Sequence, residues 1–211
     1  MIEYIIEHNI DDRIIARAVS RLEDGELVAF PTDSSWSIGC SIQSKPGIER
    51  LKKLKDDHDE HHFTLICSQI QQISDVASLS TVHFRTIKRL VPGPFVFVLP
   101  TLNRIEKIVQ MKRNEIGVRI PDNPVPRRLV DGLGCPLFSI TAKRSMVDAS
   151  LSGNAFDEEL MFDMGWEIDQ IYGISMILDP GEEHPRIMST VLDLTGPEIT
   201  VLRQGVGIYE G

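Results

Sequence analysis

Residues 27–40 read LVAFPTDSSWSIGC, and this stretch decides the fold class. Leu27 to Phe30 is a short apolar run closed by Pro31, which is typical of a buried strand. Four small polar residues, Thr32 to Ser35, follow directly. Because α/β proteins place ligand groups where strands end, the stretch favours one wall of a binding site. The alternative is an ordinary capped turn, since Thr, Asp and Ser also satisfy local backbone groups.

Helices and strands mix along the whole chain around this stretch. Apolar residues at helical spacing predict helices over 12–24, 44–54, 82–90 and 126–133. Short apolar runs predict strands over 2–6, 27–30, 63–67, 95–99, 116–120, 137–141, 176–178, 191–194 and 199–202. The least regular stretch is 153–173, in which we expect a helix within 157–164. With no repeat, linker or low-complexity segment, the pattern predicts one α/β domain over residues 1–211 with a mixed sheet.

The amino-acid composition limits where in the cell the protein is expected and which classes of partner it is expected to bind. The 211 residues are 42% hydrophobic and 25% charged, as in ordinary globular proteins. No apolar run approaches the ~20 residues of a membrane helix, and the acidic start MIEYIIEHNIDD does not resemble a signal peptide. We therefore expect a cytoplasmic protein without membrane contact. The net charge of −9 argues against indiscriminate nucleic-acid binding, although an acidic body can carry a basic cleft.

The three cysteines, Cys40, Cys67 and Cys135, are isolated from one another. No pair has CxxC spacing, and an odd count does not suggest a disulfide framework. Each lies in or beside an apolar stretch, which predicts small buried core residues.

Three further segments combine strand ends with polar or cationic residues. Arg119 lies inside the apolar strand 116–120, where an arginine needs a carboxylate partner from the protein or from a ligand. The strand 137–141 opens into Thr141 and Lys143, which suit phosphate or carboxylate binding but also fit a plain strand exit. STVLDLT at 189–195 precedes Arg203, which again pairs hydroxyls with an arginine beside a glycine.

An acidic, histidine-rich segment, DDHDEHH at 56–62, follows the basic end of the second predicted helix. Asp, Glu and His together can bind a divalent metal, although a solvated surface loop has the same composition. The chain contains neither GxGxxG nor GxxxxGK[ST] nor GxSxG, which excludes the two usual nucleotide loops and weakens a hydrolase interpretation.

Taken together, five segments resemble the YrdC family in their order and spacing over nearly the whole chain. PTDSSWSIGC is similar to the family's PTDTxYGLGC, LVPGPFVFVLP to its PGP-then-strand element, and EIGVRIPDNP to its TxGxRxPxxP segment; STVLDLT and RQG are similar to STVxD and RxG. The FTL after the histidine segment and the short length resemble the YciO branch more than the catalytic YrdC branch.

The resemblance implies a twisted open mixed α/β sheet with flanking helices and a concave binding face. Members of the catalytic branch make threonylcarbamoyl-AMP from threonine, bicarbonate and ATP, with Mg as the expected companion of ATP. That intermediate feeds the t6A modification of tRNA. Members are also described as binding double-stranded RNA through a positive concave surface.

The resemblance also implies roles for particular residues. The substrate-binding residues would be Thr32, Arg119, Thr141 and Ser189, with the Thr32 hydroxyl on threonine and the Arg119 guanidinium on its carboxylate, a bidentate task that suits arginine. The nucleotide-binding residues would be Lys55, Lys143 and Arg203, with Lys55 as the lysine of the family's KxR pair. The chemistry requires no protein nucleophile, so we assign no catalytic residue. None of the residues that the resemblance identifies is assigned as a metal ligand.

The departures from the family pattern lie mostly in the triphosphate half of the implied site. Asp57 replaces the arginine of KxR, and acid there would repel a triphosphate unless a metal intervened. The family's SxN is Thr141-Ala142-Lys143 in this chain, Glu115 replaces a threonine, and Trp36 replaces a tyrosine. The carboxylate-holding half, in contrast, keeps its residue types.

Three hypotheses follow from these observations. The first is a threonylcarbamoyl-AMP synthase-type enzyme, and the second is a module that binds tRNA, double-stranded RNA or a nucleotide without that synthesis, as a translation factor would. Its basic face would be made by Lys52, Lys53, Lys55, Lys112, Arg113, Lys143 and Arg144. The third is a metal site at His58, His61 and His62. The sequence leaves the oligomeric state open.

Overall fold

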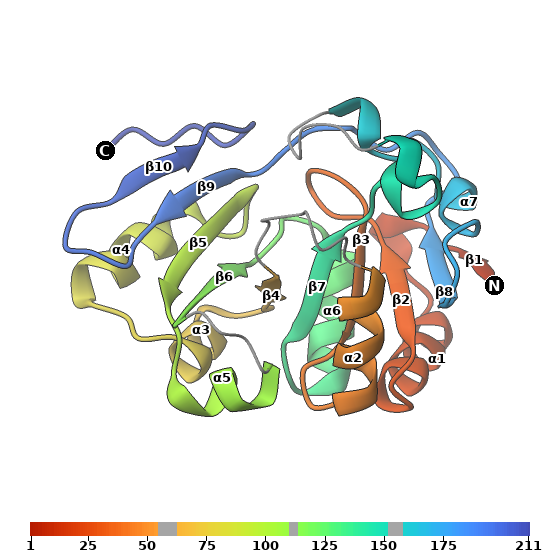
Figure 1. Ribbon diagram of the computed structural model, residues 1–211, viewed down its shortest axis with the longest axis horizontal. Helices are drawn as coiled ribbons and strands as arrows, with labels where there is room; N and C mark the ends of the chain where they lie inside the picture. The colour runs from red at the N-terminus through yellow and green to blue at the C-terminus, as the bar shows by residue number, and fades with distance from the viewer. Residues whose placement is uncertain (55–62, 110–113, 152–157) are drawn as a thin grey trace.

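The computed structural model describes residues 1–54, 63–109, 114–151 and 158–211. Within these ranges ten strands form one sheet in the order β1-β8-β2-β3-β7-β4-β6-β5-β9-β10 (Figure 1). The strands are β1 (Ile2–Tyr4), β2 (Leu27–Phe30), β3 (Ser37–Ser41), β4 (Thr64–Ile66), β5 (Phe95–Pro100), β6 (Glu115–Arg119), β7 (Leu137–Thr141), β8 (Ile174–Asp179), β9 (Thr190–Asp193) and β10 (Thr200–Arg203). The pairs β1–β8, β2–β8, β4–β6 and β5–β9 are parallel and the others antiparallel, so the predicted mixed sheet is confirmed.

Helices flank this twisted sheet. They are α1 (Asp12–Glu23), α2 (Lys45–Leu54), α3 (Ile70–Val76), α4 (Thr81–Leu90), α5 (Asn103–Val109), α6 (Pro124–Leu133) and α7 (Gly165–Ile168), with short 3-10 turns η1 (Glu7–Asn9), η2 (Arg144–Met146), η3 (Ala149–Leu151) and η4 (Glu158–Leu160). Two of their ends follow local rules. The Asp11 side chain accepts a hydrogen bond at the start of α1, and Gly134, in the left-handed conformation, ends α6.

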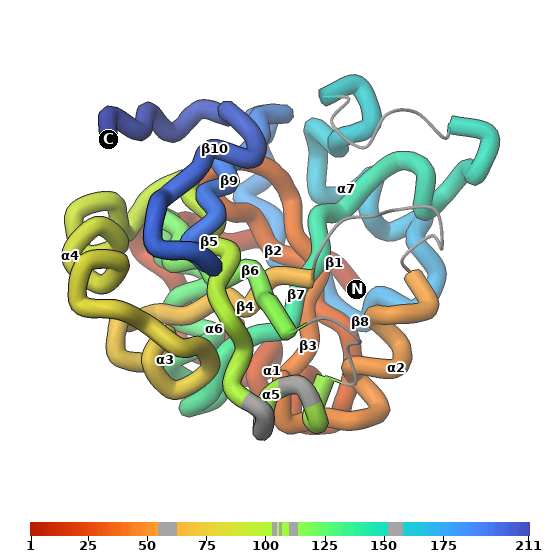
Figure 2. Tube along the Cα trace, turned by 60° about the vertical axis from the view of Figure 1, so that its left-hand side comes forward, coloured from red at the N-terminus to blue at the C-terminus, as the bar shows by residue number. Residues whose placement is uncertain are grey.

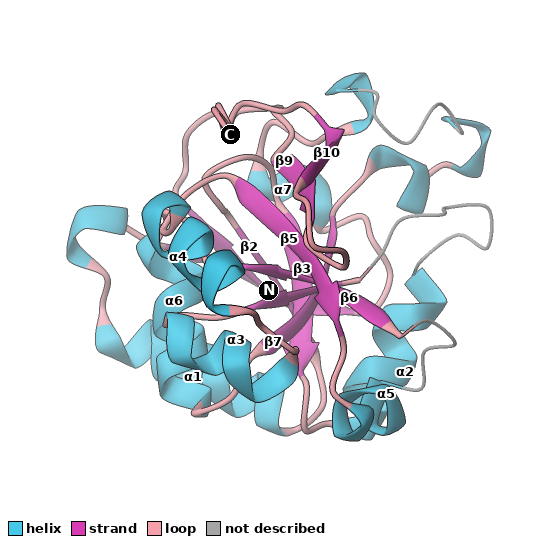
Figure 3. Cartoon of the chain, turned by 90° about the vertical axis from the view of Figure 1, so that its left-hand side faces the viewer, coloured by secondary structure: helices cyan, strands magenta, loops and turns pink. Residues whose placement is uncertain are grey.

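Strand β2 shows how the two faces of the sheet are covered. All four of its residues are buried. Leu27 and Ala29 join the larger core cluster, which includes residues of α2, whereas Val28 and Phe30 join the cluster that α1 and α6 cover. Figure 3 shows α1 and α6 on one side of the strands and α2 on the other. Burial on both faces explains why this segment reads as a continuous apolar run.

Several local predictions were wrong. The first strand ends at Tyr4 and η1 follows it, and the helix expected within 157–164 is replaced by η4, with α7 beginning only at Gly165. Strand β3 was missed, because its serines, Ser37 and Ser41, are polar although they are buried. Helices α3 and α5 were not predicted either.

The connection between β8 and β9 crosses most of the sheet. These strands are consecutive in the sequence but lie second and ninth in the sheet. Residues 180–189, which we name the crossover segment, contain no regular helix or strand and pass over the top of the molecule (Figure 1). The segment ends at Ser189, directly before β9. Strand β9 lies between β5 and the outermost strand β10 (Figure 2).

Two further expectations concern the location and the cysteines. In the part of the chain that the structure describes, no helix has the length and apolarity that a bilayer crossing requires. All three cysteines are free and buried, as predicted. Burial raises the pKa of Cys40 to about 12, as expected for a thiol that packs as a small apolar group.

Candidate functional site

The loop between β2 and β3 holds itself together through its own hydroxyl groups. Thr32 Oγ1 donates a hydrogen bond to the Ser35 carbonyl oxygen at 2.7 Å and accepts one from the Ser34 amide at 3.2 Å. Thr32, Ser34 and Ser35 are all buried. The stretch is therefore a self-capped turn, as one interpretation predicted, and the Ser34 side chain contacts Arg119 and Ser189. Its role as one wall of a binding site stays a prediction.

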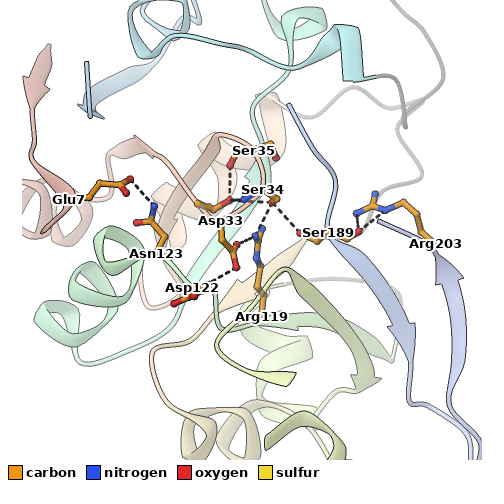
Figure 4. Close-up of polar contacts among 10 residues, drawn as sticks. Glu7, Asp33, Ser34, Ser35, Arg119, Asp122, Asn123, Ser189 and Arg203 are labelled. Atoms are coloured by element: carbon orange, nitrogen blue, oxygen red, sulfur yellow. Dashed lines mark hydrogen bonds and ion pairs between the residues drawn. The ribbon is translucent and has the colours of Figure 1, made fainter. Parts of the chain in front are cut away.

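Arg119, at the end of β6, meets this loop. Its Nη2 atom forms an ion pair with Asp33 and donates a hydrogen bond to Ser34 Oγ at 2.8 Å (Figure 4). The second Asp33 carboxylate oxygen accepts a hydrogen bond from the Asp122 amide at 2.7 Å. The arginine thus has a protein carboxylate as a partner, one of the two alternatives that the sequence left open.

Burial makes this ion pair unusual. The two side chains are only 7% and 10% exposed. Burial lowers the pKa of Arg119, and the Asp33 carboxylate opposes that shift. The Arg119 Nε atom is buried and has no hydrogen-bond partner among the residues that the structure describes. A buried unpaired N–H group is costly, so this atom is suited to an acceptor atom of a ligand.

Ser189 joins the loop to the C-terminal strands. Its Oγ atom lies 3.1 Å from Ser34 Oγ, and its carbonyl oxygen accepts hydrogen bonds from Arg203 Nε at 3.0 Å and Nη2 at 2.8 Å (Figure 4). Burial and the charge of Arg119 lower the pKa of Arg203 to about 10. We name these residues the Ser34 cluster: Asp33, Ser34, Arg119, Ser189 and Arg203. Two arginines and one carboxylate give it a net positive charge, which suits an anionic ligand.

A cavity of about 410 Å³ opens beside Arg203. Its described lining consists of Glu158, Ile187, Met188, Arg203, Gln204, Gly205 and Val206. The space matches the lower part of the range for small-molecule sites. Apolar side chains, one carboxylate and one guanidinium line it, so the cavity can take a small ligand with an anionic group.

Histidine 184 lies against the same loop, and the sequence did not single it out. Its ring makes an edge-on contact with Trp36, with 5.3 Å between ring centroids, and both side chains are buried. Burial lowers the pKa of His184 to about 4, although a hydrogen bond with the Ser35 backbone and the charge of Asp33 favour its protonation. The pattern of one histidine in a Pro- and Glu-rich stretch carries no signal for this contact, because the contact depends on the crossover segment.

The other predicted site residues have different outcomes. Thr141 pairs with Ser37 across β7 and β3 and is not part of the Ser34 cluster. Lys143 is buried and forms an isolated bridge with Met161. Lys55, Asp57 and the proposed histidine ligands lie outside the described residues. Among the residues that are described, no three His, Cys, Asp or Glu side chains gather as a metal site would require.

Arg144 is engaged in a second charged group. Its Nη1 atom lies 2.6 Å from Glu167 Oε1 and its Nη2 atom 3.1 Å from Asp163 Oδ2. Arg186 Nε reaches the other Asp163 oxygen at 2.9 Å. We name Arg144, Asp163, Glu167 and Arg186 the Arg144 cluster. Its two positive and two negative charges balance, so it offers little attraction to phosphate.

Comparisons with known proteins agree with this architecture. Residues 20–205 match the Sua5/YciO/YrdC family model, described as "Telomere recombination". The chain is 32% identical to the uncharacterized protein YciO of Escherichia coli, over 97% of this chain and 95% of that protein. The crystal structure of E. coli YciO superposes with a TM-score of 0.84 over 99% of this chain and 97% of that one.

Two further comparisons involve proteins whose names state an activity or a bound ligand. A threonylcarbamoyl-AMP synthase of Vibrio vulnificus is 31% identical over 62% of this chain and 72% of that protein. The structure of P. abyssi Sua5 complexed with L-threonine has a TM-score of 0.81 at 24% identity, over 97% of this chain and 57% of that one. At this identity the likeness to Sua5 concerns the fold.

Proposed function

The chain belongs to the Sua5/YciO/YrdC family, and from that premise we propose that it catalyses a threonylcarbamoyl-AMP synthase-type reaction, which links it to t6A modification of tRNA. The substrates would be L-threonine, bicarbonate and ATP. The observation that carries the proposal is the Ser34 cluster, in which the buried Arg119, the partly buried Arg203 and two hydroxyls converge from four separate segments.

The relatives support this choice of substrates. A threonylcarbamoyl-AMP synthase shares 31% identity with most of this chain. P. abyssi Sua5, which has the same fold, has been crystallised with L-threonine. An amino acid carboxylate would fit the buried Arg119 Nε atom, since a charged acceptor satisfies a buried N–H group best.

For this reaction the protein mainly has to position the substrates and to stabilise the charge that develops in the transition state. The threonine amine attacks bicarbonate, and loss of water gives a carbamate. A carbamate oxygen then attacks the α-phosphorus of ATP, and pyrophosphate leaves. In this scheme Ser34 and Ser189 orient the amino acid, and Arg203 stabilises the charge that develops on the phosphoryl oxygens.

Magnesium would accompany ATP in such a reaction. Mg²⁺ commonly binds through one or two carboxylates together with substrate phosphates. Glu158 supplies a carboxylate to the cavity that Arg203 lines, which fits this requirement. The ion would neutralise phosphate charge.

A purely RNA-binding role has less support within the described residues. Of the basic face suggested by the sequence, Arg144 is paired with Asp163 and Glu167, and Lys52 Nζ donates to the Val109 carbonyl. Lys143 is buried. A link to tRNA through the adenylate product requires no such face.

The test is pyrophosphate release from ATP in the presence of L-threonine and bicarbonate. We expect release that requires all three substrates and falls at least about 100-fold in Arg203→Ala, because a phosphate-side charge is lost. The matched control is Arg21→Ala, since Arg21 is a half-exposed arginine on α1 that pairs with Glu26 after the helix. No pyrophosphate at high enzyme concentration, with L-threonine binding retained in calorimetry, would instead identify a binding protein.

A further inference from the structure

The crossover segment spans nearly the full width of the sheet. Eleven Cα steps separate Asp179, the end of β8, from Thr190, the start of β9. An extended chain covers at most about 3.3–3.6 Å per residue, or about 36–40 Å here. Seven strand spacings of about 4.8 Å separate β8 from β9 along the sheet, or about 34 Å. Because the sheet is curled, the straight distance between the two strands is shorter than this, and the segment passes directly over the top of the molecule (Figure 1).

The crossover segment carries residues of both clusters, Arg186 of the Arg144 cluster and Ser189 of the Ser34 cluster. It has no helix or strand of its own to hold it, so its position depends on the points where other segments bind it. Its last residue is Ser189 of the Ser34 cluster, and Ile187 and Met188 line the cavity. The contacts that fix the middle of the segment therefore also determine the position of Ser189 and of the cavity wall.

Asp163 holds the middle of the segment at two points. Its carbonyl oxygen accepts a hydrogen bond from the His184 amide at 2.8 Å, and its carboxylate pairs with Arg186. The segment also touches the β2–β3 loop, through the contact of the His184 ring with Trp36 and through the Ile187 amide, which lies 3.5 Å from the Ser34 carbonyl oxygen. Asp163 is thus the last attachment outside the site before the segment enters it.

Asp163 is itself firmly placed. Glu167 Oε2 accepts hydrogen bonds from the Asp163 amide at 3.1 Å and the Met164 amide at 3.0 Å, at the start of α7. Arg144 pairs with both carboxylates, donates to the Met161 carbonyl at 3.0 Å and lies over the Phe162 ring. The Arg144 cluster therefore joins η2, α7 and the crossover segment in one rigid bracket.

We propose that Asp163 is a positioning residue that sets the place of Ser189 and of the cavity wall by fixing the crossover segment through Arg186. The inference rests on the proposed function only where the ligand is concerned. The segment's attachment itself is a property of the fold, so the two can fail separately.

Hydrogen exchange with mass spectrometry tests the attachment without any ligand. In Asp163→Ala we expect amide exchange in peptides that cover 184–189 to accelerate about tenfold, because the Arg186 attachment is lost. Asp163→Asn keeps an acceptor for Arg186 and should restore most of the protection. The matched control is Glu26→Ala, since the pair Arg21–Glu26 is 45% and 31% exposed against 44% and 29% for Arg186–Asp163.

The second readout is L-threonine affinity by calorimetry on the same variants. We expect a dissociation constant raised about tenfold in Asp163→Ala, largely restored in Asp163→Asn and unchanged in Glu26→Ala. If Asp163→Ala does not fold, Arg186→Ala makes the same test, since it leaves Asp163 paired with Arg144. Unchanged exchange at 184–189 in the folded variants would overturn the inference. Failure of the wild type to bind L-threonine would count against the proposed function alone.

Discussion

The Ser34 cluster and the Arg144 cluster contain the same types of charged residue but differ in burial, charge balance and hydrogen bonding. Each combines two arginines with carboxylates. In the Ser34 cluster the Arg119–Asp33 pair is 7% and 10% exposed, and two hydroxyls take part. A buried Arg119 N–H has no partner within the described part of the chain. In the Arg144 cluster four charges balance and the side chains are 14% to 44% exposed. The Ser34 cluster therefore differs from the Arg144 cluster in its excess positive charge and in one buried N–H group without a partner among the described residues.

The largest expected difference between the clusters is in stability. Arg119→Met leaves the Asp33 carboxylate buried without its cation, and we expect the free energy of unfolding to fall by about 3–5 kcal/mol. Arg186→Met removes a partly exposed pair and should cost at most about 1 kcal/mol. Urea unfolding of the two variants measures this. Equal costs would mean that burial does not separate the clusters.

The next effect concerns pH and His184, which lies between the clusters. Its pKa is about 4 in the folded protein against 6.5 for an ordinary histidine, so the unfolded chain binds more protons between these values. Stability is therefore fully present above pH 6.5 and falls as the pH drops towards 4, by about 3 kcal/mol in total. His184→Gln should remove this part of the pH dependence of urea unfolding. An unchanged pH profile in that variant would contradict the assignment.

A smaller effect is expected from the hydroxyl pair that links the β2–β3 loop to the crossover segment. Ser34→Ala and Ser189→Ala should each cost about 1 kcal/mol of unfolding free energy. Because the two Oγ atoms lie 3.1 Å apart, the double variant should cost less than the sum of the single ones. Strict additivity in urea unfolding would indicate that the two hydroxyls do not interact.

The smallest effect is predicted for RNA binding through the Arg144 cluster. Since the carboxylates of Asp163 and Glu167 already neutralise Arg144, Arg144→Ala should leave the salt dependence of any double-stranded RNA binding nearly unchanged. Fluorescence anisotropy between about 50 and 200 mM salt is a suitable measurement. A slope reduced by about one unit would show that this arginine contacts phosphate.

Local features of the chain were predictable because neighbouring residues decide them. Strand β2 follows from a four-residue apolar run before proline, and α1 from helical spacing after the capping Asp11. Strand β3 was not predictable in this way, since Ser37 and Ser41 are polar and only their burial among other strands identifies them. Of the residues named for the site, Arg119, Ser189 and Arg203 meet in one cluster, whereas Thr141 lies outside it. Their roles in binding stay predictions.

The sequence by itself determined the family resemblance, the mixed α/β class and the segments that contribute to the site, because these depend on short motifs and local periodicity. Only the tertiary structure decided which atoms meet. Asp33 pairs with Arg119 over 86 positions of the chain, and Ser34 meets Ser189 over 155. Such contacts depend on strand order and on the length of the crossover segment, and no local pattern specifies them. The sequence therefore predicted a candidate site at Thr32 to Ser35, and the tertiary structure determined which residues contact it.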